Sequence, residues 1–258
     1  MIELVTERMR QLWIGGKPVA SRAGSVRVIT DPATLEPIDE VYEGTTDDVR
    51  TAVESAKAGH AHWRRVPAVE RARLLHETAV ALRGDRAILS ELLTREGGKP
   101  RIENLDEVEW CAACFDYYAE IARNSHGSSV PPVAEHQVNF TIKEPLGVIG
   151  CIAPFNYPLL LMTWKIAPAI AAGNAVVMKP SELTPLATLR MAERCLSHLP
   201  PGVANVVTGG PPVGEALVEH PDVACIAFTG STSVGTRIAT KAAARLARVN
   251  LELGGIDP

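Results

Sequence analysis

Five turns of the chain carry residues that could hold or transform a small molecule. They read APFNYP, KPSE, TGGPPVG, FTGSTSVG and ELGG, and each follows a short apolar run. The turns contain the amide of Asn156, the amine of Lys179 and the carboxylates of Glu182 and Glu252. Amides donate hydrogen bonds and ionised carboxylates accept them, while glycines let a bound group approach the backbone closely. Gathered in one place, these turns would form a polar binding site.

The elements that must position the turns alternate between strand and helix from Gly147 onward. Apolar runs and helical periodicity predict these elements. The predicted strands cover 148–153, 175–179, 205–208, 225–229 and 249–253, and the predicted helices 161–172, 185–198, 213–220 and 234–247. This alternation predicts an α/β domain with a Rossmann-like parallel sheet flanked by helices.

The carboxyl ends of the predicted strands explain why the five turns belong together. In an open parallel sheet, ligands bind outside the carboxyl ends of the strands, so all five turns share one edge. Gly210, Gly214, Gly230 and Ser231 lie where helices begin after strands. Glycine-rich helix N-termini favour the negative charge of a pyrophosphate. The alternative is that these glycines only make tight turns. We expect a dinucleotide site.

The first part of the chain is predicted to be mainly helical. An extended opening over 12–19 precedes a helix that Thr45 or Thr46 can cap. A longer helical pattern follows Pro67 and is interrupted by Gly97, Gly98 and Pro100. We interpret 1–123 as the N-terminal helical part of the cofactor domain, 124–146 as an extended arm or hairpin, and 147–258 as the parallel dinucleotide-binding part. Alternation over 136–143 is typical of an edge that pairs with another subunit, so we expect the full-length form to be a homo-oligomer.

Composition excludes several classes of function. The 258 residues carry a formal net charge of −4 and are 46 % hydrophobic and 22 % charged, as in ordinary globular proteins. No basic stripe indicates nucleic acid, and the longest apolar stretch is shorter than the roughly 20 residues of a membrane span. The N-terminus lacks the apolar core of a signal peptide. We therefore expect no nucleic acid or membrane partner and a cytoplasmic location.

The five cysteines do not suggest a disulfide framework or a metal site. Their number is odd and their spacing is uneven. Cys111 and Cys114 form a CxxC, but the surrounding segment has a helical pattern, and neither a second CxxC nor a His pair at ligand spacing occurs. Two cysteines packed on a helix are the favoured interpretation over redox or zinc chemistry. We expect no metal.

The usual nucleotide and hydrolase fingerprints are missing. The chain has no GxGxxG and no GxSxG. Gly230 and Gly235 have the glycine spacing of a P-loop, but Thr236 stands where that motif needs lysine. No YxxxK follows any tyrosine that a short-chain dehydrogenase would use. The dinucleotide edge must therefore belong to another family.

Taken together and in order, the motifs resemble the aldehyde dehydrogenase superfamily. The C-terminal segments that carry the resemblance are PFNYP, WKIAP, GN, KPSELTP, PGVANVVTG, FTGS and LELGG, and the N-terminal ones run from IGG through DP to GGK. They cover nearly the whole chain with matching order and spacing. The resemblance implies an oxidoreductase that converts a small-molecule aldehyde to a carboxylic acid with NAD or NADP.

The resemblance implies catalytic roles for two residues. Asn156 would donate to the oxyanion that forms on the aldehyde carbon, and Glu252 would be the general base that activates water. Without the motifs, Asn156 would be an ordinary turn residue and Glu252 a solvated strand end. Lys165, in the WKIAP helix, could assist proton transfer. The aromatic residues Trp110, Tyr117 and Tyr118 would be helix-face residues or line a substrate tunnel.

The resemblance also implies the residues that hold the cofactor. Lys179 and Glu182 would bind the adenosine ribose, and a carboxylate there favours NAD because it would repel a 2′-phosphate; NADP is less favoured. Ser181 could instead only cap a helix. The expected cofactor-binding residues are Ile152, Ala153, Pro154, Phe155, Lys179, Ser181, Glu182, Gly210, Gly214, Phe228, Thr229, Gly230, Ser231 and Leu253.

The nucleophile that the family uses has no counterpart in this sequence. The resemblance implies a cysteine thiolate a few dozen residues beyond Glu252, whereas the chain ends at Pro258. Cys151 and Cys225 fall in predicted strands and are interpreted as structural. We therefore expect a chain truncated before the catalytic cysteine, without the catalytic domain, and inactive by itself. The alternatives are a stand-alone NAD-binding module and an interaction protein that pairs with full-length subunits.

Overall fold

A seven-stranded sheet forms the centre of the molecule in the computed structural model, which describes residues 11–255. Its order is β11-β10-β7-β8-β9-β1-β2. The first five strands in that order are parallel, and the hairpin β1–β2 adds two antiparallel strands beside β9. The strands are β1 Leu12–Ile14, β2 Lys17–Val19, β7 Val148–Ile152, β8 Ala175–Lys179, β9 Ala204–Val206, β10 Val223–Gly230 and β11 Arg248–Leu253.

Four helices connect the parallel strands and cover both faces of the sheet. They are α5 Pro158–Ala171, α6 Leu186–Cys195, α7 Pro211–Glu219 and α8 Thr232–Ala243. From β7 the chain moves through β8 to β9 and then returns to the other side of β7 as β10. The direction of winding therefore reverses between β7 and β10, and at such a point the crossover loops diverge and leave a crevice. The predicted Rossmann-like parallel sheet is confirmed.

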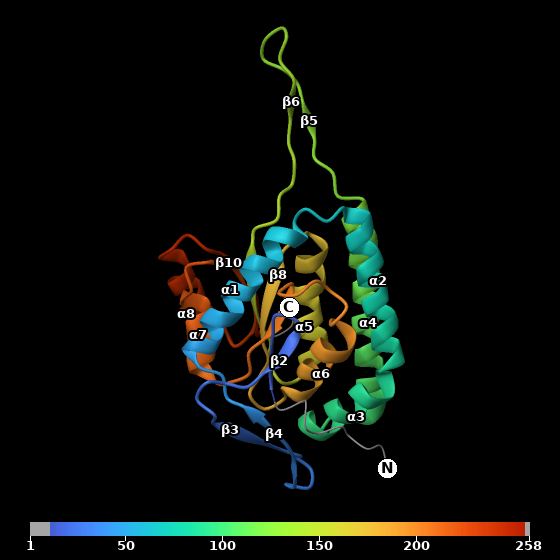
Figure 1. Cartoon of the computed structure of the whole chain (residues 1–258), viewed down its shortest axis with the longest axis vertical. Helices are drawn as coiled ribbons and strands as arrows, with labels where there is room; N and C mark the ends of the chain where they lie inside the picture. The colour runs from blue at the N-terminus through green and yellow to red at the C-terminus, as the bar shows by residue number, and fades with distance from the viewer. Residues whose placement is uncertain (1–10, 256–258) are drawn as a thin grey trace.

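The N-terminal helices complete the two faces. α1 (Thr46–Trp63) packs with α7 on one face, and α2 (Ala68–Gly84), α3 (Arg86–Gly97) and α4 (Arg101–Arg123) pack with α5 and α6 on the other. Figure 1 shows α2 and α4 on one side of the molecule and α7 and α8 on the other. α1 begins with a capping box in which Thr45 and Asp48 bond each other's backbone N–H.

Two local features differ from the prediction. The long pattern after Pro67 is two helices, because the chain turns at Asp85, whose carboxylate accepts two bonds from Arg190 at 2.5 and 2.6 Å. An antiparallel hairpin of β3 (Val26–Thr30) and β4 (Pro37–Tyr42) was not predicted. Both strands are short, and each has polar and apolar residues on the same face, so neither shows the clean alternation that predicts a strand.

The hydrophobic core lies on both sides of the sheet. Every residue of β7 and β8 is buried, as expected for parallel strands that are covered on both faces. One cluster of buried side chains lies against α2, α4, α5 and α6, and a second lies against α1, α7 and α8. The body of the domain therefore holds the carboxyl ends of the parallel strands at fixed positions.

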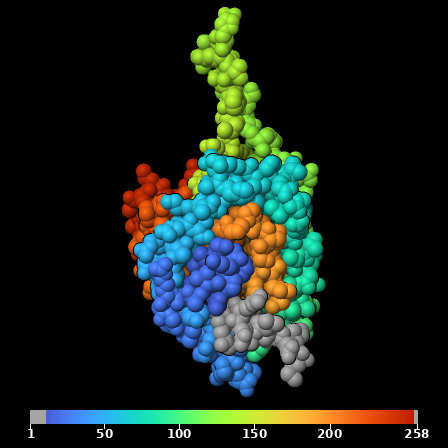
Figure 2. Space-filling view, in the orientation of Figure 1, coloured from blue at the N-terminus to red at the C-terminus, as the bar shows by residue number. Residues whose placement is uncertain are grey.

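The predicted arm is a hairpin that projects from the body. β5 (Ser129–Val130) pairs with β6 (Asn139–Phe140), and Figures 1 and 2 show the hairpin rising well beyond the rest of the molecule. Its apolar side chains are exposed, with Val138 85 % and Phe140 68 % accessible. Over residues 11–255, no helix has the length and apolarity that a membrane crossing requires.

Candidate active site

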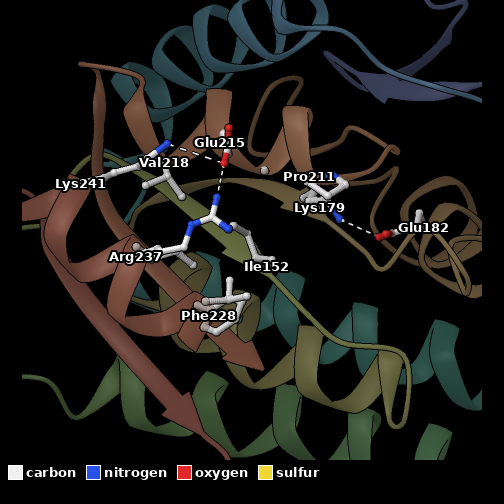
Figure 3. A pocket seen from close by; sticks show the side chains of 12 residues that line it. Ile152, Lys179, Glu182, Pro211, Glu215, Val218, Phe228, Arg237 and Lys241 are labelled. Atoms are coloured by element: carbon white, nitrogen blue, oxygen red, sulfur yellow. Dashed lines mark hydrogen bonds and ion pairs between the residues drawn. The ribbon is translucent and has the colours of Figure 1, made fainter. Parts of the chain in front are cut away.

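A cavity of about 230 Å³ opens where the winding of the sheet reverses, with α7 and α8 as its walls. Figure 3 shows it from close by. The residues that line it come from the ends of β7, β8 and β10 and from the two helices: Ile152, Lys179, Glu182, Pro211, Gly214, Glu215, Val218, Phe228, Val234, Arg237, Ile238 and Lys241. The aliphatic and aromatic members form a wall suited to a flat apolar ring, and the charged members lie around it.

Lys179 and Glu182 form one polar corner of the cavity. Lys179 ends β8, donates to the carbonyl of Pro180 at 2.9 Å, and lies with its Nζ 3.5 Å from Oε2 of Glu182. Burial lowers the pKa of Lys179, and the Glu182 charge opposes that shift. Gly214 faces the aliphatic part of the Lys179 side chain, where an added Cβ would lie 3.6 Å from Cδ. This corner offers a cation and a carboxylate to a polar ligand.

Ion pairs between α7 and α8 line the opposite rim. Arg237 and Lys241 of α8 pair with Glu215 of α7, and Lys241 also lies 2.5 Å from Glu219. Sequence reasoning missed these residues, and it also missed Val218, Val234 and Ile238. The i, i+4 spacing of Arg237 with Lys241 and of Val234 with Ile238 was visible in the sequence, but only the packing of α7 against α8 places both pairs at a cavity.

A second polar cluster joins α5, β10 and β11. Lys165 donates to the hydroxyl of Thr229 at 2.5 Å, and that hydroxyl donates to Oε2 of Glu252 at 3.0 Å. The Lys165 side chain is 4 % exposed and the Glu252 side chain 45 %. Burial lowers the pKa of Lys165, and the carboxylate of Glu252, 3.9 Å from Nζ, counteracts this. The Glu252 carboxylate is therefore accessible to solvent on one side and lies 3.9 Å from the buried Lys165 amine on the other.

Asn156 lies exposed in the turn between β7 and α5. Its neighbours in the turn behave differently from one another: Ala153 is buried, Pro154 is half-buried, and Phe155 is exposed and lines a separate hollow together with Glu182 and Thr184. An exposed amide at a strand end can donate to a bound group.

The glycines and serine at the helix starts have clear structural positions. Gly210 is the N-cap of α7, and Ser231 is the N-cap of α8, where its hydroxyl accepts from the N–H of Val234 at 3.4 Å. A side chain at Gly230 would collide with the ring of Phe228. Leu253 ends β11 and packs against Gly235, where an added Cβ would require the Leu253 side chain to shift.

The predicted site residues thus fall into two groups. The structure brings Ile152, Lys179, Glu182, Gly214 and Phe228 together at the cavity. The others lie at the same strand ends without lining it: Ala153, Pro154, Phe155, Asn156, Ser181, Gly210, Thr229, Gly230, Ser231, Glu252 and Leu253. Ser181 is buried, and its hydroxyl accepts from the N–H of Leu183 at 3.3 Å. Their roles toward a ligand remain predictions.

Of the aromatic residues of α4, Tyr118 interacts with Glu252 of the second cluster. Trp110 and Tyr117 are exposed, and Tyr117 stacks edge-on against Tyr118. Burial raises the pKa of Tyr118, and the nearby Cys114, Tyr117 and Glu252 add to that rise. The Tyr118 phenol is therefore close enough to Glu252 to feel its charge. Whether this face of α4 lines a substrate path remains a prediction.

All five cysteines have a raised thiol pKa. Burial raises the pKa of every thiol: to about 11 for Cys114, to about 12 for Cys151 and Cys195, and well above the usual value for Cys111, with a smaller rise for Cys225. The thiolate is the reactive form. No cluster of three or more potential metal ligands occurs among the residues that the structure describes.

With this geometry in place, comparison with known proteins identifies the family. Residues 19–258 match the aldehyde dehydrogenase family, and the chain belongs to that family. It is 42 % identical to betaine aldehyde dehydrogenase 1 of Oryza sativa, over 96 % of this chain and 51 % of that protein. It is 45 % identical to retinaldehyde dehydrogenase 3 of Mus musculus, over 92 % and 48 %. The chain spans about half the length of the curated relatives it matches.

Solved structures confirm the fold. A betaine aldehyde dehydrogenase point mutant from Staphylococcus aureus, in complex with NAD+, superposes with a TM-score of 0.95 at 33 % identity, over 98 % of this chain and 52 % of that chain. An aldehyde dehydrogenase from Bacillus cereus gives 0.93 at 34 %, over 96 % and 52 %. Relatives include a peroxisomal protein of Pisum sativum and a mitochondrial one of Arabidopsis thaliana, so the cytoplasmic location remains a prediction.

Proposed function

We propose that this chain supplies the cofactor-binding part of an NAD-dependent aldehyde dehydrogenase, with Asn156 as oxyanion donor and Glu252 as general base. The observation that carries the proposal is the arrangement at the carboxyl edge of the sheet. A cavity of about 230 Å³ lies where the winding of the sheet reverses. At the residue after Phe228, which lines this cavity, Thr229 connects a buried amine to a solvent-accessible carboxylate.

The residues at the cavity fit a dinucleotide. The apolar wall formed by Val218, Val234 and Ile238 can cover an adenine ring, and the Glu182 carboxylate can accept from ribose hydroxyls. The helix starts at Gly210 and Ser231 offer N–H groups to a pyrophosphate. When bound, the nicotinamide accepts a hydride from the substrate carbon.

Cofactor preference follows from Glu182. A carboxylate near the ribose would repel a 2′-phosphate, which favours NAD over NADP. Structural relatives include an NAD complex and an Escherichia coli enzyme described as NADP dependent, so the family permits both. Lys179 and Arg237 at the same cavity add positive charge and would reduce the discrimination.

The family match and the exposed positions of Asn156 and Glu252 support the proposed catalytic roles. Asn156 would donate its amide N–H to the oxygen of the aldehyde as negative charge develops there. Glu252 would take a proton from the water that releases the acid. The Thr229 hydroxyl, which donates to Glu252 and accepts from Lys165, would hold the Glu252 carboxylate in position. Burial raises the pKa of each of the five thiols, so we propose none of them as the nucleophile of this reaction.

Titration calorimetry of the purified chain tests the cofactor assignment. We expect weak but saturable NAD binding, weaker NADP binding, and no aldehyde oxidation. Glu182→Gln should raise the Kd for NAD about fivefold, which corresponds to a loss of roughly 1 kcal/mol of binding free energy. It should also reduce the ratio of the Kd for NADP to the Kd for NAD. Val80→Ser, on the exposed face of α2, is the matched control. Absence of saturable NAD binding would overturn the assignment.

A fusion to the complementary half of the Staphylococcus aureus enzyme tests the catalytic roles. If the fusion oxidises betaine aldehyde, Asn156→Ala should lower kcat by about 10²–10³-fold, as loss of an oxyanion donor does. Glu252→Gln should lower the rate of acid release. Unchanged kcat in either variant would contradict the corresponding role. A second candidate is a non-catalytic NAD-binding module, which the raised pKa values of the five thiols favour; turnover by the unfused chain would exclude it.

A further inference from the structure

Two buried carboxylates from the N-terminal helices hold the starts of two crossover helices. Glu107 of α4 is 0 % exposed, and its Oε1 accepts from the backbone N–H groups of Leu159 and Leu160 at 3.0 Å each. Glu96 of α3 is 4 % exposed, and its two oxygens accept from Leu186 and Ala187 at 2.7 and 2.9 Å. Neither carboxylate lines the cavity that holds the proposed adenosine site.

These contacts replace caps that α5 and α6 lack. The N-cap residues Tyr157 and Pro185 make no capping bond with their side chains. The first N–H groups of a helix have no partner within it, and leaving them buried without an acceptor is costly. The oxygens of a carboxyl group satisfy these N–H groups, and where the group is ionised it also interacts favourably with the positive end of the helix dipole. The acceptors therefore come from residues far away in the chain.

Each capped helix directly follows a turn of the binding edge. The turn that carries Asn156 runs from the end of β7 to the start of α5, and the turn that carries Glu182 runs from β8 to α6. The sheet holds one end of each turn. Glu107 and Glu96 hold the other end, at the first residues of the helices.

Lys99 strengthens the first of these two attachments. Its ammonium forms an ion pair with Oε2 of Glu107 and lies 3.5 Å from the centroid of the Tyr157 ring. A cation over an aromatic face is attractive, and more so when the cation is shielded from water. Tyr157 follows Asn156 directly, so Lys99 contacts the side chain next to the proposed oxyanion donor while its partner Glu107 binds the backbone beyond it.

We propose that Glu107 and Glu96 are positioning residues for two different functions of the edge. Glu107, together with Lys99, fixes the turn of Asn156 and thereby the oxyanion donor. Glu96 fixes the turn of Lys179 and Glu182 and thereby the ribose-binding corner. The assignment rests on the proposed function, and it requires that the two effects be separable.

Two matched substitutions, Glu107→Gln and Glu96→Gln, test this separation. Glutamine keeps one acceptor oxygen but replaces the other with an NH₂ group. At Glu107 that group would face the ammonium of Lys99, and at Glu96 it would face a backbone N–H. Backbone amide order parameters from NMR report on residues 155–157 and 181–184, and calorimetry reports on ADP-ribose binding.

Each variant should loosen only its own turn. In Glu107→Gln we expect the order parameters of residues 155–157 to fall from the rigid range, roughly 0.85, toward 0.6, with the ADP-ribose Kd changed less than twofold. In Glu96→Gln we expect loss of order in 181–184 and an ADP-ribose Kd about fivefold higher, with 155–157 unchanged. A purely structural role would loosen both turns in both variants and would overturn the proposal.

A second variant keeps the test decisive if Glu107→Gln does not fold. In Lys99→Met/Glu107→Gln no buried charge is left unpaired, and loosening of 155–157 alone is again expected; rigid 155–157 would overturn the proposal. Failure of the wild-type chain to bind ADP-ribose would instead refute the proposed function, while the order parameters would still test whether each carboxylate positions its turn.

Discussion

Glu96 shows how a single buried carboxyl group can link structure to pH. Its oxygens accept two backbone N–H bonds at the start of α6. Those bonds favour the ionised form, but burial outweighs them and raises the pKa of Glu96 to about 8. The folded chain therefore holds a proton at Glu96 that the unfolded chain has released. Whatever stability this proton provides is complete below pH 4.5 and disappears as the pH rises through about 8.

The pH dependence of unfolding is the measurable consequence of this residue. Between pH 4.5 and 8, Glu96 should lower the free energy of unfolding by up to about 1.4 kcal/mol per pH unit. Glu96→Gln removes this term, so the destabilisation that it causes at pH 5 should shrink as the pH rises to about 8 and then stay level. Urea unfolding at several pH values measures it. His76, whose pKa is raised by Asp116 and Glu120, contributes equally in both proteins and cancels. A constant difference would contradict the raised pKa.

At the scale of elements, the start of α5 depends on an ion pair that is remote in the sequence. Lys99 lies just before α4, and Glu107 lies two turns into that helix. Their side chains are 17 % and 0 % exposed. A buried ion pair adds little net stability over apolar replacements, but removal of one partner leaves an uncompensated buried charge. The pair is thus better understood as a requirement of α5 than as a source of stability.

A double-mutant cycle tests this view of the pair. Lys99→Met should destabilise the chain by about 3 kcal/mol because it leaves Glu107 unpaired. Lys99→Met/Glu107→Gln should recover most of that loss, since neither side chain is then charged. Chemical denaturation measures both. The control Arg101→Met, at an exposed pair with Glu91 3.9 Å away, should cost less than about 0.5 kcal/mol. Additive losses in the double variant would rule out the coupling.

For the whole molecule, the projecting hairpin is the feature that a single copy does not explain. Its strands pair only with each other, and its side chains at Val133, Val138, Phe140 and Ile142 are largely exposed. A row of apolar side chains on an extended arm would bury its surface against another copy. The expectation of a homo-oligomer therefore remains a prediction about this arm.

Substitution on the arm should change assembly without changing the fold. We expect Val138→Asp/Phe140→Asp to lower the molar mass measured by light scattering after gel filtration, with little change in thermal stability. Val69→Asp/Val80→Asp places the same charges at exposed valines of α2 and should leave the mass unchanged. An equal effect of both pairs would show that charge, and not the arm, governs association.

Much of this molecule could be predicted because its signals are local. Helical periodicity and apolar runs located all five parallel strands and their crossover helices to within a few residues. Turn chemistry identified the edge at which Asn156, Lys179 and Glu252 lie. The hairpin β3–β4 escaped because its short strands mix polar with apolar residues. The break between α2 and α3 escaped because the Asp85–Arg190 pair joins residues 105 positions apart.

The sequence by itself determined the class of fold, the family and the edge at which we propose that ligands bind, because periodicity and turn residues are properties of neighbouring positions. Only the tertiary structure decided which groups meet at that edge. Thr229 of β10 forms hydrogen bonds with Lys165 of α5 and Glu252 of β11, three residues from three different elements. The cavity has two walls only because α7 packs against α8. Glu107 and Glu96 cap helices 52 and 90 residues away. Such contacts leave no periodic trace in the sequence, since they arise only when buried donors need acceptors after the chain has folded.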